Sequence, residues 1–328
     1  MSGSPPPPLP PFPLSVRFAF AAGLLVAVLA VCEVAVRVID GNAFPQLDSF
    51  ELREGQVRLA ADTTVRLRRA DGKTYALNTG AYGLRLPDAG DTLVIGDSQV
   101  LGLGVADEDA FPALAGMRNA GVPGHGVVDA LEHARELVPK LSPKRVIVCL
   151  NQANDWADGL RPASERYLVA GGWLGSPERK GTLAAAFWAS PLSQVHLFAV
   201  ATMVFEAHPG KAPPVPDAAT TAALTQSFAA LLRAFRADFP SVTVDVLYLP
   251  ADAATSEARA ARSPLGFPGQ PWLDPTLRDG VHAALPDFTV IDPTDSLADP
   301  ADFLDGDYHL SEAGHRQVAA ALRGPGAP

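Results

Sequence analysis

Cysteine and positive charge are both in short supply in this chain. Only two cysteines occur in 328 residues, Cys32 in an apolar N-terminal stretch and Cys149 in a later apolar run. A disulfide between them would have to join a membrane-like segment to a domain core, so both are interpreted as small hydrophobic residues. Cysteine and histidine ligands at a spacing that suits a zinc site are missing as well. The formal net charge of -10 argues against binding to nucleic acid, which requires a cationic surface.

Polar residues are scarce between residues 14 and 38, and the few charged ones lie near the ends. This length and composition suffice for a helix that crosses a membrane. A cleaved signal peptide would need a small-residue cleavage site after the apolar core, and none is well placed. A lipoprotein signal would need a small residue before Cys32, but that position is Val31. We therefore expect a transmembrane signal anchor at residues 14–38, after a disordered, proline-rich tail at residues 1–13.

After the anchor, the sequence pattern changes twice. Residues 41–88 alternate apolar and polar side chains around Asp71-Gly72, which predicts a small β-rich collar with a hairpin. From residue 91 to about residue 323, apolar strands alternate with helical segments, which predicts an α/β domain with a parallel sheet. Residues 156–216 are interpreted as a helical insertion, although burial in a core would also explain their apolar run. The expected strands are 92–95, 117–120, 145–150, 242–249 and 288–291, and the expected helices are 110–115, 127–137, 218–237 and 311–322.

Three polar stretches follow predicted strands and carry residue types that are used in catalysis. The first strand runs into Gly96-Asp97-Ser98, the second into a loop with Gly124, and the third into Asn151-Gln-Ala-Asn154. In an open parallel sheet, ligands bind at the carboxyl ends of the strands. A glycine backbone can approach a ligand closely, and the Asn154 amide can donate to an oxyanion. Each stretch also has an ordinary explanation: a turn at Ser98, a plain loop at Gly124 and a helix cap at Asn154.

A fourth stretch, Asp305-Gly-Asp307-Tyr-His309, precedes the expected C-terminal helix. Its histidine lies on a loop, where it can act as the base for a serine hydroxyl, and a neighbouring carboxylate can orient the imidazole. In an extended chain, residues two apart point to the same side, which favours Asp307 over Asp305 as the orienting acid. His315 falls inside the helix and is interpreted as structural.

In this order, the four stretches resemble the signature blocks of the SGNH/GDSL hydrolase family: Gly-Asp-Ser, a second-block glycine, Gly-x-Asn-Asp and Asp-x-x-His. The resemblance covers residues 91 to about 323. It implies a flavodoxin-like three-layer α/β/α sandwich with a five-stranded parallel sheet. It also implies Ser98 as the nucleophile and His309 as the general base. The oxyanion hole would consist of the Ser98 and Gly124 backbone N–H groups and the Asn154 side chain.

The chain departs from the family pattern at three positions. Gln99 replaces the usual leucine after Gly-Asp-Ser, a change that is expected to matter little, and Gln152 replaces the glycine of the third block. Gly306 occupies the place of the usual acid, so that Asp307 instead matches the Asp-x-His spacing of related polysaccharide O-acetyltransferases. Residues 78–85, Asn-Thr-Gly-Ala-Tyr-Gly-Leu-Arg, resemble a motif of a membrane-anchored bacterial subgroup.

The resemblance implies a serine hydrolase that cleaves an ester through an acyl-serine intermediate, with no metal or cofactor. The expected substrate is an acylated small molecule, glycan or lipid of the cell envelope. The expected location is the bacterial inner membrane, with a single pass and the catalytic domain outside the cytoplasm. Two alternatives stay open: an O-acyltransferase that acts on polysaccharide with the same site, and a non-catalytic glycan-binding scaffold.

Overall fold

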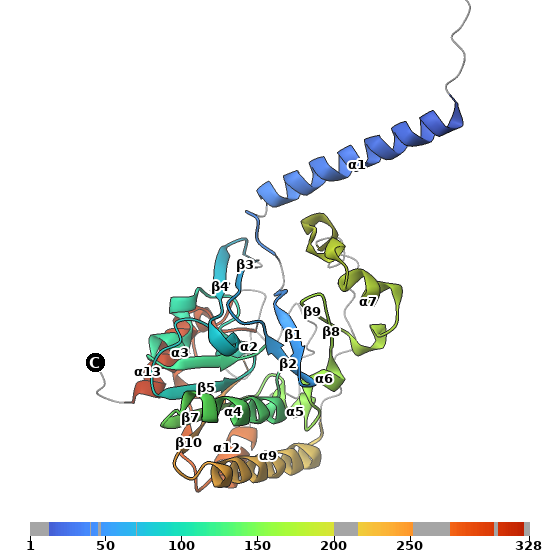
Figure 1. The fold of residues 1–328 in the computed structure, drawn as a ribbon. Helices are drawn as coiled ribbons and strands as arrows, with labels where there is room; N and C mark the ends of the chain where they lie inside the picture. Colours follow the sequence, from blue (N-terminus) through green and yellow to red (C-terminus); the bar gives the residue numbers. More distant parts are fainter. Residues whose placement is uncertain are drawn as a thin grey trace, which may run out of the picture.

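An N-terminal helix, α1 (Leu14–Ile39), precedes a collar of short strands and a layered α/β domain (Figure 1). The computed structural model describes residues 13–39, 41–44, 47–69, 71–199, 216–251, 276–304 and 308–324. Of the tail expected at residues 1–13, all but Pro13 lies outside the described residues.

Helix α1 is long and apolar enough to cross a membrane by length and composition, with a mean hydropathy of 2.5 in its most apolar window. A signal sequence near an N-terminus has the same properties. Near the C-terminal end of the helix, the Glu33 carboxylate pairs with Arg37 and accepts the backbone N–H groups of His196 and Leu197, at 3.1 and 2.8 Å. These bonds join the end of α1 to the insertion.

Two antiparallel hairpins form the collar. Strand β1 (Phe50–Arg53) pairs with β2 (Gln56–Leu59), and β3 (Thr64–Arg68) pairs with β4 (Thr74–Asn78). The first turn is formed by Glu54 and Gly55, both at positive φ, which is the backbone conformation that two-residue hairpin loops require. Apolar collar side chains pack against Leu101 and Val122 of the α/β domain in one cluster, so the two parts share a core.

The central sheet has five strands in the order β11-β10-β7-β5-β6, and every neighbouring pair is parallel. Their bounds are β5 (Thr92–Gly96), β6 (Arg118–Gly121), β7 (Arg145–Asn151), β10 (Thr243–Leu249) and β11 (Val290–Ile291). Numbered along the chain, the spatial order is 2-1-3-4-5, which is the flavodoxin-like arrangement. The predicted five-stranded parallel sheet is confirmed.

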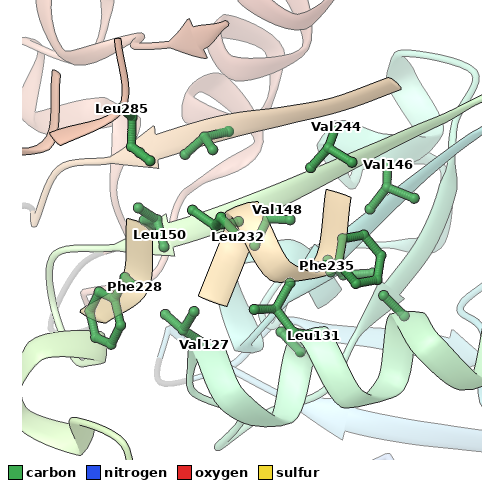
Figure 2. Close-up of a cluster of buried hydrophobic side chains, with 14 of the residues drawn as sticks. Val127, Leu131, Val146, Val148, Leu150, Phe228, Leu232, Phe235, Val244 and Leu285 are labelled. Carbon is green, nitrogen blue, oxygen red and sulfur yellow. The ribbon is translucent and has the colours of Figure 1, made fainter. Parts of the chain in front are cut away.

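Helices cover both faces of the sheet, because successive strand residues point to opposite sides. Val146, Val148 and Leu150 pack against α4 (Val127–Leu141), α9 (Ala218–Asp238) and α12 (Thr276–Ala284), as Figure 2 shows for part of this cluster. Ile147 and Cys149 instead pack towards α3 (Phe111–Leu114) and α13 (Glu312–Arg323). Cys149 is therefore a core residue, and the α/β/α sandwich has the three layers that the resemblance implies.

The insertion contains strands as well as helices in its described part. Helices α5 (Asp155–Asp158), α6 (Ala163–Arg166) and α7 (Leu183–Trp188) occur together with a hairpin of β8 (Leu168–Ala170) and β9 (Trp173–Gly175). The hairpin turns at Gly171-Gly172, both at positive φ, and an added Cβ at residue 172 would lie 2.0 Å from the Asp48 carbonyl oxygen. Strands of three residues are too short for an alternating pattern to reveal, so only helices were predicted here. The end of the insertion, residues 200–215, lies outside the described residues.

Candidate active site

Polar side chains meet at the carboxyl ends of β5 and β7. These neighbouring strands are the first and third along the chain, and the second strand, β6, lies on the far side of β5. Connections from β5 and β7 therefore lead away to opposite sides, which opens a crevice where ligands bind in such folds. Ser98 follows β5 and Asn151 ends β7, so both belong to this crevice edge.

Ser98 and His309 form a hydrogen-bonded pair across 211 residues of chain. The His309 Nε2 atom lies 2.8 Å from the Ser98 Oγ atom, and both residues are 6% exposed. For the hydroxyl to donate to Nε2, the neutral imidazole has to carry its proton on Nδ1. In that tautomer, the ring can accept the serine proton directly.

The turn before Ser98 is fixed by a buried carboxylate. Asp97 caps helix α2 (Ser98–Leu101), because its Oδ1 accepts the Gln99 N–H at 2.9 Å. Its Oδ2 accepts the Asn151 Nδ2 at 2.6 Å, which ties the end of β5 to the end of β7. Burial raises the pKa of Asp97, and the hydrogen bonds from Asn151 and Gln99 oppose that rise.

Gly121 gives the same turn its close packing on β6. A Cβ atom at this position would lie 2.2 Å from the Leu101 backbone nitrogen and 2.8 Å from the Asp97 carbonyl oxygen. Only glycine therefore lets the backbone of α2 lie across the end of β6. The sequence indicated only a plain loop at Gly121, so this packing role was not predicted.

The loop around His309 is held by backbone pairing on one side. The Leu304 N–H donates to the His309 carbonyl at 2.8 Å, and Leu310 forms a bridge with Phe303. Ser311 then caps α13, because its hydroxyl accepts the N–H groups of the helix start. The histidine is thus fixed between a short antiparallel pairing and a capped helix. Asp305 and Asp307, the candidates for the orienting acid, lie outside the described residues.

Gly124 has a left-handed backbone at φ +82°, in the loop after β6. A Cβ atom here would lie 2.9 Å from the Tyr167 ring, so both the conformation and the space favour glycine. The Gly124 carbonyl accepts a bond from the Arg166 guanidinium at 2.7 Å. Among the described residues, the N–H groups of Gly124 and Ser98 donate to no other protein atom.

Asn154 precedes α5 but makes no capping bond to it. Its Nδ2 lies 3.5 Å from an Asp158 carboxylate oxygen, and its side chain also makes a hydrogen bond that lowers the pKa of Asp97. The amide therefore lies near both the Asp158 and the Asp97 carboxyl groups, the latter next to Ser98, and the explanation of Asn154 as a helix cap is wrong.

Buried carboxyl groups surround this part of the site. Asp155 accepts the Asn151 N–H at 2.6 Å, and burial, together with the charge of Asp97, raises the pKa of Asp155 well above its usual value. Burial also raises the pKa of Asp158 to about 6, although the nearby Arg166 guanidinium opposes the shift. Burial therefore favours the neutral form of all three carboxyl groups.

Arg166 joins three of the segments around the site, a role that the sequence did not predict. Its guanidinium pairs with Asp158 at 2.9 Å and with Asp129 at 3.2 Å, in addition to its bond to the Gly124 carbonyl. Asp129 in turn accepts the N–H of Gly126 at the start of α4. No motif surrounds Arg166 in the sequence, so only the fold reveals that it connects these loops.

His315 lies on α13, away from the Ser98 hydroxyl. Its Nδ1 accepts the Phe111 N–H at 3.1 Å, and its ring stacks on the Phe111 ring. Burial, helped by the positive charge of Arg85, lowers the pKa of His315 to about 3. Within the described part of the chain, no group of three or more His, Cys, Asp or Glu side chains could hold a metal ion.

No protein-family model matches the chain, and no curated protein matches it. Solved structures are similar to it at low sequence identity. A protein assigned to the lipolytic G-D-S-L family from Desulfitobacterium hafniense DCB-2 is 13% identical, with a TM-score of 0.39 over 70% of this chain and 96% of its own. TesA is 15% identical, with a TM-score of 0.38 over 70% and 94%. A catalytic mutant of Axe2, an acetylxylan esterase from Geobacillus stearothermophilus, is 16% identical, with a TM-score of 0.38 over 71% and 91%.

Proposed function

We propose that this chain is a serine esterase of the SGNH/GDSL type, with Ser98 as the nucleophile and His309 as the general base. One observation carries the proposal: the 2.8 Å contact between the Ser98 hydroxyl and the His309 imidazole, at the crevice edge of a flavodoxin-like sheet. A serine is a weak nucleophile unless a base takes its proton, and this pair supplies that base within hydrogen-bond reach.

The proposed reaction proceeds through two acyl transfers. Ser98 Oγ attacks the ester carbonyl carbon while His309 Nε2 accepts the hydroxyl proton, which yields a tetrahedral oxyanion. The oxyanion collapses, the alcohol leaves with the proton from His309, and the acyl group stays on Ser98. A water molecule then attacks in the same way, with His309 first accepting and then returning a proton, and the free acid is released.

Three donors are proposed to stabilise the oxyanion: the N–H groups of Ser98 and Gly124 and the Asn154 side chain. The unused N–H groups and the orientation of the Asn154 amide towards Asp97 support this assignment. Preorganised donors of this kind typically contribute a few kcal/mol each to the transition state. We propose Asp307, in preference to Asp305, as the acid that orients His309.

The proposed substrate is an acyl ester on a glycan or lipid of the cell envelope, and α1 is the proposed membrane anchor. Its length and hydropathy support a single pass through the membrane, and its contact with the insertion through Glu33 keeps the α/β domain close to that membrane. We propose that the domain lies outside the cytoplasm of a bacterium.

The test is covalent labelling of the full-length chain in detergent micelles with a fluorophosphonate, together with hydrolysis of p-nitrophenyl acetate. The wild type is expected to be labelled and active. Ser98→Ala should lose both properties, and His309→Ala should lower both by about a thousandfold or more, because the hydroxyl loses its base. Ser227→Ala, a change on the outer face of α9, is the control and should behave as wild type. If the wild type is neither labelled nor active, the esterase proposal fails.

A further inference from the structure

We infer that Gln99 is a positioning residue that holds the imidazole of His309 in reach of Ser98, an inference that rests on the proposed function. The Gln99 side chain bonds to the backbone on both sides of the histidine. Its Nε2 donates to the Tyr308 carbonyl at 3.0 Å, and its Oε1 accepts the Leu310 N–H at 3.1 Å.

Gln99 is itself held rigidly. It is only 4% exposed, and its backbone N–H donates to the Asp97 carboxylate at 2.9 Å. Because it directly follows Ser98 in α2, the nucleophile and the group that holds the base loop are neighbours in one short helix. The Gln99 side chain therefore links the loop that carries Ser98 directly to the loop that carries His309.

The two bonds from Gln99 to Tyr308 and Leu310, called the clamp below, require a group such as an amide. The group has to donate to a carbonyl on one side of His309 and accept from an N–H on the other, and the amide of Asn or Gln does both in one planar unit without depending on pH. The opposite edge of the same loop pairs with Phe303 and Leu304. His309 thus lies on a strand-like segment with hydrogen bonds on both edges, one edge being supplied by Gln99.

A hydrophobic residue at position 99 would fill the space without making these bonds. Leucine, the usual residue after Gly-Asp-Ser in the pattern that this chain resembles, has nearly the volume of glutamine but would leave the buried Leu310 N–H without its acceptor. The proposed role therefore departs from the expectation that the change to glutamine matters little. A misplacement of about 1 Å in a catalytic group can lower the rate on the order of a hundredfold.

The experiment compares Gln99→Leu and Gln99→Glu with the wild type, as full-length chains in detergent micelles, using p-nitrophenyl acetate. Gln99→Leu is expected to lower kcat about tenfold to a hundredfold, because the base is displaced from the hydroxyl. KM should change by less than about threefold, since the clamp faces the histidine loop and not the ester. Fluorophosphonate labelling should slow by the same factor as kcat.

The pH dependence of the kcat of Gln99→Glu distinguishes a positioning role from a purely structural one. A carboxylate can accept the Leu310 N–H but cannot donate to the Tyr308 carbonyl, whereas a protonated carboxyl group can do both. The ratio of the kcat of Gln99→Glu to that of the wild type should therefore rise as the pH falls from 8 to 6. The same ratio for Gln99→Leu should stay flat.

Thr225→Val is the control for lost stability. Its hydroxyl accepts the Trp156 indole N–H at 2.9 Å in a buried contact on α9, so the variant loses a buried hydrogen bond away from His309. It should unfold at a lower temperature yet keep the wild-type kcat well below that temperature. If Gln99→Leu also keeps the wild-type kcat while Ser98→Ala is inactive, the positioning role is wrong and the esterase proposal stands. If the wild type itself is inactive, the esterase proposal fails and the positioning role fails with it.

Discussion

Asn154 stands at the start of α5 without capping it, and its amide lies instead beside the Asp97 carboxylate, next to Ser98. A capping bond is typically worth about 1 kcal/mol, and the Asn154 side chain does not make one. The proposed role is donation to the oxyanion, an interaction that forms only during the reaction.

Asn154→Ala is therefore expected to lower kcat by roughly a hundredfold or more, because the oxyanion loses one donor. The free energy of unfolding should fall by only about 1 kcal/mol, since the variant loses hydrogen bonds to the Asp158 and Asp97 carboxyl groups but no capping bond. Steady-state kinetics and chemical denaturation would measure the two effects separately. An unchanged kcat would remove Asn154 from the oxyanion hole.

Individual site residues could be predicted where reactive side chains lie close together in the sequence. Ser98 and His309 were identified in this way, and the fold brings them into hydrogen-bond contact. Gln99 and Arg166 were not, because their partners are backbone atoms of distant segments, at Tyr308 and Leu310 in one case and Gly124 in the other. The preference for Asp307 over Asp305 stays a prediction.

Short elements around the site are joined by buried ion pairs and not by a continuous sheet. Helix α6, which carries Arg166, reaches α5 through Asp158 and α4 through Asp129. Both Arg166 and Asp129 are almost fully buried. Removing one member of such a network leaves the remaining charges without compensation in a medium of low dielectric constant.

Arg166→Met should accordingly lower the free energy of unfolding by about 3 kcal/mol or more, since two buried carboxyl groups lose their cation. It should also lower kcat, because the Gly124 loop loses its bond to the guanidinium. Chemical denaturation and ester hydrolysis of the full-length chain would test both effects. Arg161→Met, on an exposed position of the same segment, is the matched control and should be near neutral for both. A stability loss without any change in kcat would make Arg166 a purely structural residue.

Elements were predictable in proportion to their length and periodicity. The strands β5, β7 and β10 and the helices α4 and α9 appear within a few residues of their expected bounds. Helix α12 was missed because proline-rich and glycine-rich chain precedes it, and the β8–β9 hairpin was missed because its strands are too short. Tertiary contacts, such as the packing of Gly172 against Asp48, determine these short elements.

At the scale of the whole molecule, a buried arginine adds to the shared apolar core that connects the collar to the α/β domain. Arg85 is fully buried, pairs with Asp107 at 2.7 Å and donates to the carbonyl oxygens of Leu101 and Gly102 at the C-terminal end of α2. The backbone N–H and side chain of Asn78, at the end of β4, bond to the same Asp107 carboxylate. The motif at residues 78–85 therefore has a physical explanation: it fastens the collar to the helix that begins with Ser98.

Buried neutral histidines make the stability of the molecule sensitive to acid. Burial lowers the pKa of His315 to about 3 and that of His125 to about 4, whereas both would titrate near 6.5 in the unfolded chain. Between these values the unfolded chain binds more protons than the folded one, so the stabilising contribution of each neutral ring is complete above about pH 6.5 and is lost as the pH falls. Asp158, with its pKa raised to about 6, acts in the opposite direction, because its folded form binds the extra proton.

The difference between His315→Asn and the wild type isolates one of these contributions. Asparagine can still accept the Phe111 N–H through its Oδ1 atom, which replaces the Nδ1 acceptor of the histidine, but it does not titrate. Subtracting the free energy of unfolding at pH 5 from the value at pH 7 within each protein cancels the effect of the changed packing. Between pH 7 and pH 5, the wild type should lose about 2 kcal/mol more of this free energy than the variant does. Chemical denaturation of the full-length chain at both pH values provides the measurement. If the two proteins change equally, His315 is not a neutral buried group in the folded state, and the acid sensitivity has to arise at another site.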